Sequence, residues 1–171
     1  MEEKETSSTA IEAPERSLEP ANSRPKEDRV LKALTFLLAN EEYAIYILVI
    51  QEIARPIAVT HVPRVPAYIR GIANLRGRVI PILDLHTRLG LSAFVPGSRN
   101  RFVICHTESG EVGILADKVN DVVELKRNKL QPPPAKIAAS GSGFITHIGR
   151  VGGRILIVLD TEKILQLHRG D

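Results

Sequence analysis

Few residues of this chain have the types and spacing that catalysis or metal binding would require. The five histidines lack the short intervals of a metal site, and the chain has a single cysteine, Cys105. Cys105 lies inside an apolar run, so we interpret it as a core residue rather than a nucleophile. Motifs of P-loop, zinc-protease and serine-hydrolase sites are absent from the sequence. We therefore predict no catalytic residue, no metal and no cofactor.

One segment does combine charge, glycine and a following apolar run: IRGIANLRGRVIPILDL, residues 69–85. Its arginines and glycines suit a phosphate, a nucleic acid, a partner protein or only a tight turn. The glycines do not follow G-x-G-x-x-G, and they precede a strand-like run rather than a helix. A phosphate cradle at the start of a helix is therefore excluded, which leaves the other readings open.

Charge is unevenly distributed along the 171 residues, whose net charge is +3. Residues 1–30 hold eight acids and five bases, and the remainder holds twelve acids and eighteen bases. A basic body suits RNA, but the arginines are spread singly and aromatic residues make up only 4%. We expect no nucleic-acid partner, and a basic RNA-binding β-barrel is kept only as an alternative.

The chain shows no feature of a membrane or secreted protein. No apolar run approaches the roughly 18 residues of a membrane span, and no signal-peptide pattern is present. Hydrophobic residues make up 43% and charged residues 25%, which is ordinary for a globular protein. We expect a cytoplasmic protein without direct membrane insertion.

The order of residue types predicts an all-β domain behind a disordered tail. Residues 1–30 are polar and rich in Pro, Ser and Glu, so they bury too little apolar surface to fold. Beyond them, short apolar and β-branched runs alternate with turn residues at regular spacing, which favours a barrel or sandwich. We expect a tight hairpin at Gly152-Gly153 and a short helix over 66–72. A closing helix over 161–167 is expected to be capped by Thr161.

The chain also repeats itself. Shifted by 76 residues, YIRGIANLRGRVIPILDLHTRL falls on FITHIGRVGGRILIVLDTEKIL, and shifted by 69, EYAIYILVIQEI falls on EVGILADKVNDV. Two matching blocks in the same order indicate two copies of one β unit. Each copy is too small for its own core, so the two must pack together. We expect one subdomain over about 31–95 plus C-terminal elements and a second over about 100–150.

Equivalent residues of the repeat are expected to be structural. Gly77 and Gly153 occupy equivalent turns, while Asp84 and Asp160 end equivalent strands and are expected to cap the next turn. Function is better sought where one copy differs from the other.

Two further comparisons come from the repeat. Glu52 is equivalent to Asp121, which favours a shared structural role over a pair of catalytic acids. Residues 74–76, Asn-Leu-Arg, stand where the second copy has Arg-Val-Gly at 150–152. Arg76 is therefore special to the first copy.

Four successive blocks carry a family resemblance: NEEYAIYILVIQEI, VPAYIRGIANLRGRVIPILDL, EVGILADKVNDVVEL and FITHIGRVGGRILIVLDTEKIL. They resemble the CheW family, the adaptors of bacterial and archaeal chemosensory arrays, over about residues 31–168. The resemblance implies two intertwined, SH3-like, five-stranded β-barrels around a common core, with small corner helices and a short C-terminal helix. It implies no catalysis.

The resemblance also implies partners. Members bind the cytoplasmic tip of methyl-accepting chemotaxis receptors and the regulatory domain of the histidine kinase CheA, so the chain is expected to be recruited to membrane-associated arrays. A scaffold of a non-flagellar chemosensory pathway is an alternative within the same family.

Site residues are implied by the same resemblance. The positions that match the family's receptor-binding groove are Ile50, Glu52, Gly71, Arg76, Val119 and Val122. Glu52 and Arg76 match a family salt bridge, and if it is partly buried, losing one partner would cost about 3 kcal/mol. His86 departs from the family, which often has arginine there.

Overall fold

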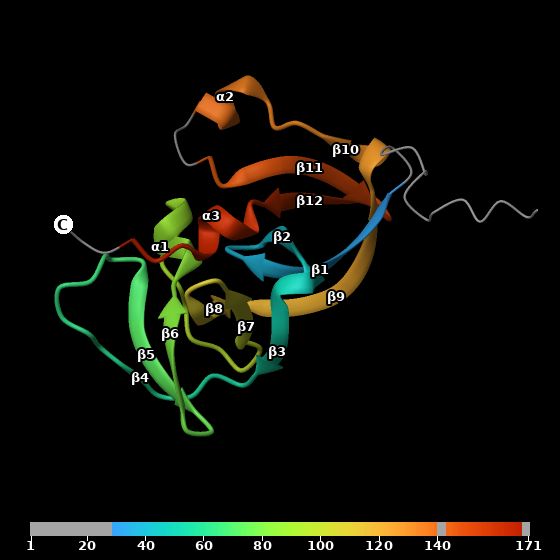
Figure 1. The fold of residues 1–171 in the computed structure, drawn as a ribbon. Coiled ribbons are helices and arrows are strands. Elements are labelled where there is room, and N and C mark those ends of the chain that lie inside the picture. Colours follow the sequence, from blue (N-terminus) through green and yellow to red (C-terminus); the bar gives the residue numbers. More distant parts are fainter. Residues whose placement is uncertain (1–28, 140–142, 169–171) are drawn as a thin grey trace, which may run out of the picture.

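The structure, a computed structural model, describes residues 29–139 and 143–168 (Figure 1). The predicted tail lies almost wholly outside these residues. Sheet A contains, in spatial order, β10 (Leu130–Gln131), β11 (Ile145–Val151), β12 (Arg154–Leu159), β2 (Glu41–Tyr46), β1 (Val30–Leu38) and β9 (Lys118–Lys126). Sheet B contains β3 (Ile50–Ala54), β7 (Arg101–Thr107), β8 (Gly110–Ala116), β6 (Arg78–Leu83), β5 (Ile69–Leu75) and β4 (Val59–Thr60). The short helices are α1 (Leu85–Leu89), α2 (Ala135–Ala139), α3 (Thr161–Leu165) and the 3₁₀ turns η2 (Ile47–Val49) and η3 (Arg127–Lys129).

The predicted all-β class is confirmed, with one difference in strand number. Each sheet has five longer strands, as expected for each barrel, and a sixth strand of only two residues, β4 or β10. These two short strands lie at the outer edges of their sheets, so they extend the expected arrangement without changing it.

The internal repeat is visible in the strand order. A shift of 76 residues carries β5 onto β11, β6 onto β12 and α1 onto α3 with identical bounds. A shift of 69 carries the starts of β2 and β3 onto β8 and β9 to within one residue. When every strand is exchanged for its equivalent, the order of sheet A becomes the order of sheet B. The two sheets are therefore copies of one topology.

Each sheet mixes strands from both of the expected ranges, about 31–95 and about 100–150. Sheet A takes β1 and β2 from the first range, β9 to β11 from the second and the C-terminal β12, and sheet B takes the rest. The crossing points are η2, which leads from β2 into β3, and the start of β9 after β8 (Figure 1). The copies thus exchange their later strands, which makes the two barrels intertwined.

A central cluster of buried apolar residues joins the two sheets. It draws on β1 and β2 of sheet A, on β7 and β8 of sheet B, and on α1 and α3. Its largest fully buried members include Phe36, Ile45, Leu83 and Ile114. Two smaller clusters fill the individual sheets, one around Phe102 in sheet B and the other in sheet A. Burial of a side chain of this size contributes about 1.5 to 3 kcal/mol, so the central cluster stabilises both sheets together.

Both predicted aspartate caps are confirmed. The Asp84 carboxylate accepts from the Thr87 N–H at 3.2 Å at the start of α1. Asp160 accepts from the Lys163 N–H at 3.1 Å at the start of α3. The prediction of Thr161 as the cap is wrong, because Asp160 is the extended residue before the helix and Thr161 is already its first residue.

The helix expected over 66–72 is also wrong. A single turn bond from the Ile69 N–H to the Pro66 carbonyl, 2.9 Å, is followed at once by β5. Pairing of β5 with β6, the next strand of the same hairpin, satisfies the backbone there and overrides the helix signal of Pro66. The hairpin predicted at Gly152-Gly153 is confirmed, with φ of +55° and +78° at the two glycines.

We expect Gly71→Ala to lower the free energy of unfolding by about 2 to 3 kcal/mol. Gly71 has a φ of +144°, and a Cβ there would lie 2.1 Å from the Thr60 carbonyl oxygen of β4. Urea unfolding followed by circular dichroism measures the loss. Gly97→Ala is the control, because its Cβ would meet only Asn100 Oδ1 at 3.8 Å. Equal stability of the two variants would contradict the close β4–β5 approach.

Candidate functional site

Irregular strand pairing positions one acid at the edge of each sheet. In sheet B the register of β3 on β7 passes from Ile50–Cys105 to Glu52–Ile104, which leaves one extra residue on β3. In sheet A the pairing of β9 with β1 shifts at the equivalent place, beside Asp121. A β-bulge of this kind re-aims the neighbouring side chain. The same kind of β-bulge therefore positions both Glu52 and Asp121.

Glu52 holds two arginines of the β5–β6 hairpin. Arg76 Nη2 donates to both Glu52 carboxylate oxygens, at 2.5 and 2.6 Å. Arg78 Nη2 lies 3.3 Å from Glu52 Oε1, and Arg78 Nη1 donates to Glu111 on β8. The ion pair between Glu52 and Arg76 is thus present, within a network that ties the hairpin tip to β3 and β8.

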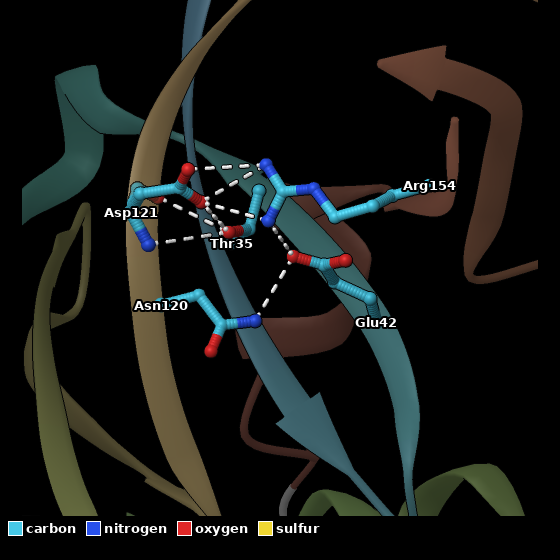
Figure 2. A network of polar contacts seen from close by, with 5 residues as sticks. All are labelled: Thr35, Glu42, Asn120, Asp121 and Arg154. Atoms are coloured by element: carbon cyan, nitrogen blue, oxygen red, sulfur yellow. Dashed lines mark hydrogen bonds and ion pairs between the residues drawn. The ribbon is translucent and has the colours of Figure 1, made fainter. Parts of the chain in front are cut away.

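The second network lies in sheet A and is built around Arg154 (Figure 2). Arg154 Nη1 donates to Glu42 Oε1 at 2.9 Å, and Nη2 donates to Asp121 Oδ2 at 3.0 Å. The buried Thr35 hydroxyl donates to Asp121 Oδ1 at 2.6 Å, and the Asn120 amide donates to Glu42 at 3.0 Å. One guanidinium therefore joins three strands, β12, β2 and β9.

The two networks are the same structure in two copies. The repeat carries Arg78, Glu111 and Glu52 onto Arg154, Glu42 and Asp121, respectively. This supports the expected structural role of the two equivalent acids. Sequence reasoning overlooked the contribution of the two arginines, although their identity in the repeat was a usable signal.

Arg76 is what distinguishes the first network from the second. Its φ is +53°, and its equivalent in the second copy is Gly152, with φ +55°. A non-glycine residue in this left-handed region costs about 1 to 2 kcal/mol. The Arg76 side chain is 68% exposed, so its ion pair with Glu52 contributes at most about 1 kcal/mol. The Glu52 side chain is 27% exposed, but Arg78 remains beside it when Arg76 is removed, so a 3 kcal/mol loss is not expected. Stability alone does not explain an arginine here.

The other expected groove residues lie in three places. Ile50 and Val119 are half-buried at equivalent points of β3 and β9, and both pack against the central cluster. Val122 lies on β9 opposite Leu34 and is 54% exposed. Gly71 is buried in β5 against β4, where its lack of a side chain has a structural reason. The structure brings Glu52 and Arg76 into contact and places Ile50 on the same strand as Glu52.

In the described part of the chain, little supports a nucleophilic or metal-binding site. Burial raises the pKa of the Cys105 thiol to about 12, so the thiolate is scarce at neutral pH, as expected of a core cysteine. Within residues 29–139 and 143–168, no three His, Cys, Asp or Glu side chains are grouped to hold a metal ion. No helix in these ranges has the length and apolar character to cross a membrane.

Comparison with known proteins supports the resemblance noted in the sequence. The model of the CheW-like domain family matches residues 32–169. The chain is 33% identical to the chemotaxis protein CheW of Helicobacter pylori, over 89% of this chain and 93% of that protein. It is 36% identical to CheW of Treponema pallidum, over 80% and 83%. The crystal structure of the scaffolding protein TtCheW from Thermoanaerobacter tengcongensis superposes with a TM-score of 0.72 at 26% identity, covering 82% of this chain and 95% of that one.

We expect Arg76→Gly to change the free energy of unfolding by less than about 1 kcal/mol. Loss of the exposed ion pair with Glu52 is offset by relief of the left-handed backbone strain at this position. Chemical denaturation of both proteins at pH 7 tests this. A loss of 3 kcal/mol would show that the Glu52–Arg76 pair is a buried structural interaction after all.

Asp121→Asn should remove a stabilising contribution that depends on pH. Hydrogen bonds from Arg154 and then from Thr35 lower the pKa of Asp121 below its usual 3.8. A lowered folded-state pKa stabilises the fold above the usual value and ceases to do so as pH falls through the folded-state value. The difference in unfolding free energy between wild type and Asp121→Asn should be below about 1 kcal/mol, because the group is exposed. It should be constant above about pH 5 and shrink below about pH 4.

Urea unfolding across pH 2.5 to 7 measures this difference. Glu108→Gln is the control, since Glu108 is an exposed turn residue between β7 and β8. A difference for Asp121→Asn that persists unchanged down to the lowest pH would contradict the assignment.

Proposed function

The chain belongs to the CheW family, and from this premise we propose that it is a non-enzymatic adaptor that couples chemoreceptors to the histidine kinase CheA. Its relatives are named chemotaxis proteins, and the similar solved structure is named a scaffolding protein. The proposed partners are the cytoplasmic tip of methyl-accepting receptors and the regulatory domain of CheA. The proposed location is the cytoplasm, at receptor arrays.

Arg76 carries this proposal. The side chain is exposed, it is held in one direction by both oxygens of Glu52, and it occupies a position that suits glycine. A guanidinium fixed in this way offers its remaining donors to a carboxylate or carbonyl of a partner. An arginine retained against backbone strain is typical of a functional position.

The surroundings of Arg76 suit a helical partner. Ile50 is half-buried on the same strand as Glu52, and Leu48 in η2 just before it is 92% exposed. Recognition of a helix by a shallow apolar surface with a few oriented polar groups is a recurrent mode of binding. A receptor tip, which is a helical hairpin in the family, is therefore the partner proposed for this side. No residues are assigned to the kinase side.

Arg76→Gly should weaken binding of a receptor hairpin fragment at least tenfold and leave binding of the CheA regulatory domain within twofold of wild type. Loss of one oriented charged contact, about 1.5 to 3 kcal/mol, accounts for a change of this size. Isothermal titration calorimetry with each purified partner from the same organism measures both affinities.

Arg150→Ala is the matched control, because Arg150 is an exposed arginine on β11 of the other sheet. It should leave both affinities unchanged. Receptor binding by Arg76→Gly at wild-type strength would place the receptor surface elsewhere. Failure of the wild-type protein to bind either partner would overturn the adaptor proposal.

A further inference from the structure

A cavity of about 760 Å³ opens between the segment 55–59, which follows β3, and the loop 94–102. Its size is typical of small-molecule sites. Three of the side chains that line it are arginines, Arg55, Arg70 and Arg101, and the described residues that line it include no acid. The apolar part of its wall includes Ile57 and Phe94.

Two of these arginines lie at the end of the same strand pair. The β3–β7 ladder ends with Ala54 opposite Phe102, and the next residues along the two segments are Arg55 and Arg101, which both line the cavity. The repeat-equivalent positions in sheet A are Glu124 and Lys32, and the two are paired directly across β9 and β1. Opposite charges across a strand pair are stabilising and like charges are destabilising. Sheet B therefore has two like charges at the end of a strand pair where its copy has opposite charges.

The protein itself satisfies only one of these two guanidinium groups. Arg101 Nη1 donates to the carbonyls of Ser98 and Asn100, at 3.1 and 2.7 Å. Arg55 makes no hydrogen bond or ion pair with any part of the chain that the structure describes. Its guanidinium is exposed beside the cavity and has five donors available.

Arg70, the third arginine, adds to the positive charge at the cavity. Arg70 stacks on the Phe94 ring at 5.0 Å and lies 3.6 Å from Asp84 Oδ2, where the repeat equivalent of Arg70 is the neutral Thr146. Among the described residues, Asp84 is the only acid that forms an ion pair with any of the three arginines, and it also caps α1. An excess of about two positive charges remains, and a dianion would neutralise it.

The loop that forms one wall is held in place. Asn100 is buried, accepts from the Gly97 N–H and donates to the Asp117 carbonyl at 3.2 Å. The buried His86 ring places Nδ1 2.6 Å from the Ser92 carbonyl and Nε2 2.9 Å from Asp117 Oδ1. A wall fixed by buried contacts lowers the entropy that a ligand must remove on binding.

We propose that this cavity binds a small aromatic phosphate ester. The phosphate lies between Arg55 and Arg101, whose planar forks match its oxygens, and its charge offsets theirs. The ring lies against Ile57, which is 39% exposed, and Phe94. This site is distinct from Arg76 and does not depend on the adaptor proposal.

Titration of the full chain by ¹H–¹⁵N NMR tests the proposal with three probes: phenyl phosphate, inorganic phosphate and benzyl alcohol. Phenyl phosphate should give saturable shifts in 55–59 and 94–102 and bind about tenfold more tightly than inorganic phosphate. Benzyl alcohol should give none. Equal affinity for the two phosphates would overturn the proposed ester and leave an anion site only, and shifts confined to other residues would overturn the site.

Two substitutions and a control accompany the titration. Arg101→Gln and Arg55→Glu should each weaken phenyl phosphate at least tenfold. Arg55→Glu breaks no contact in the described chain, and it gives sheet B the opposite charges that sheet A has at the equivalent positions. It should therefore remain folded even if Arg101→Gln does not. Arg150→Gln, on β11 of the other sheet, should bind as wild type. An equal loss in Arg150→Gln, or none in Arg55→Glu, would contradict the site.

Discussion

The fold depends on one constraint: neither copy of the repeat can bury its apolar face alone. The central cluster takes residues from β1 and β2 of one sheet and β7 and β8 of the other, and α1 and α3 complete it. Since each copy contributes its first two strands to one sheet and its later strands to the other, the sheets cannot separate without breaking backbone pairing. The shared core thus fixes the relative position of the two barrels, and with it every surface that spans them.

On this frame the acid–arginine networks tie each hairpin tip to its sheet. Arg78 and Arg154 do so in the same way, which explains why identical residues occur at equivalent points. Their contribution lies in orientation more than in free energy, because all these groups are partly exposed. Arg76 adds to one network a side chain that the fold does not require, since the other copy has glycine there.

The repeat serves as an internal comparison, and both proposed sites emerge from it. Each lies in sheet B, at a place where the equivalent residues of sheet A form a locally relaxed structure: Gly152 in its turn, and Lys32 opposite Glu124. In sheet B the same backbone carries a left-handed arginine at one place and two arginines at the end of one strand pair at another. Residues that are locally unfavourable for the fold are typical of functional positions. One barrel of the pair therefore has the locally stable residues at both places, and the other does not.

The sequence alone determined the features that arise from short-range chemistry. Alternating apolar runs predicted the strands, Gly152-Gly153 predicted a turn, and Asp84 and Asp160 predicted helix caps, because the side chain and the backbone it satisfies are neighbours. The resemblance placed Glu52 and Arg76 as a pair. Strand pairing decided the rest: the β5–β6 hairpin replaced the helix expected from Pro66, and long-range pairing exchanged strands of the two copies between the sheets. The placement of Arg55 and Arg101, 46 residues apart in the chain, at the end of one strand pair follows from the β3–β7 register alone. Register is set by which apolar faces are buried together, and that is a property of the whole folded core.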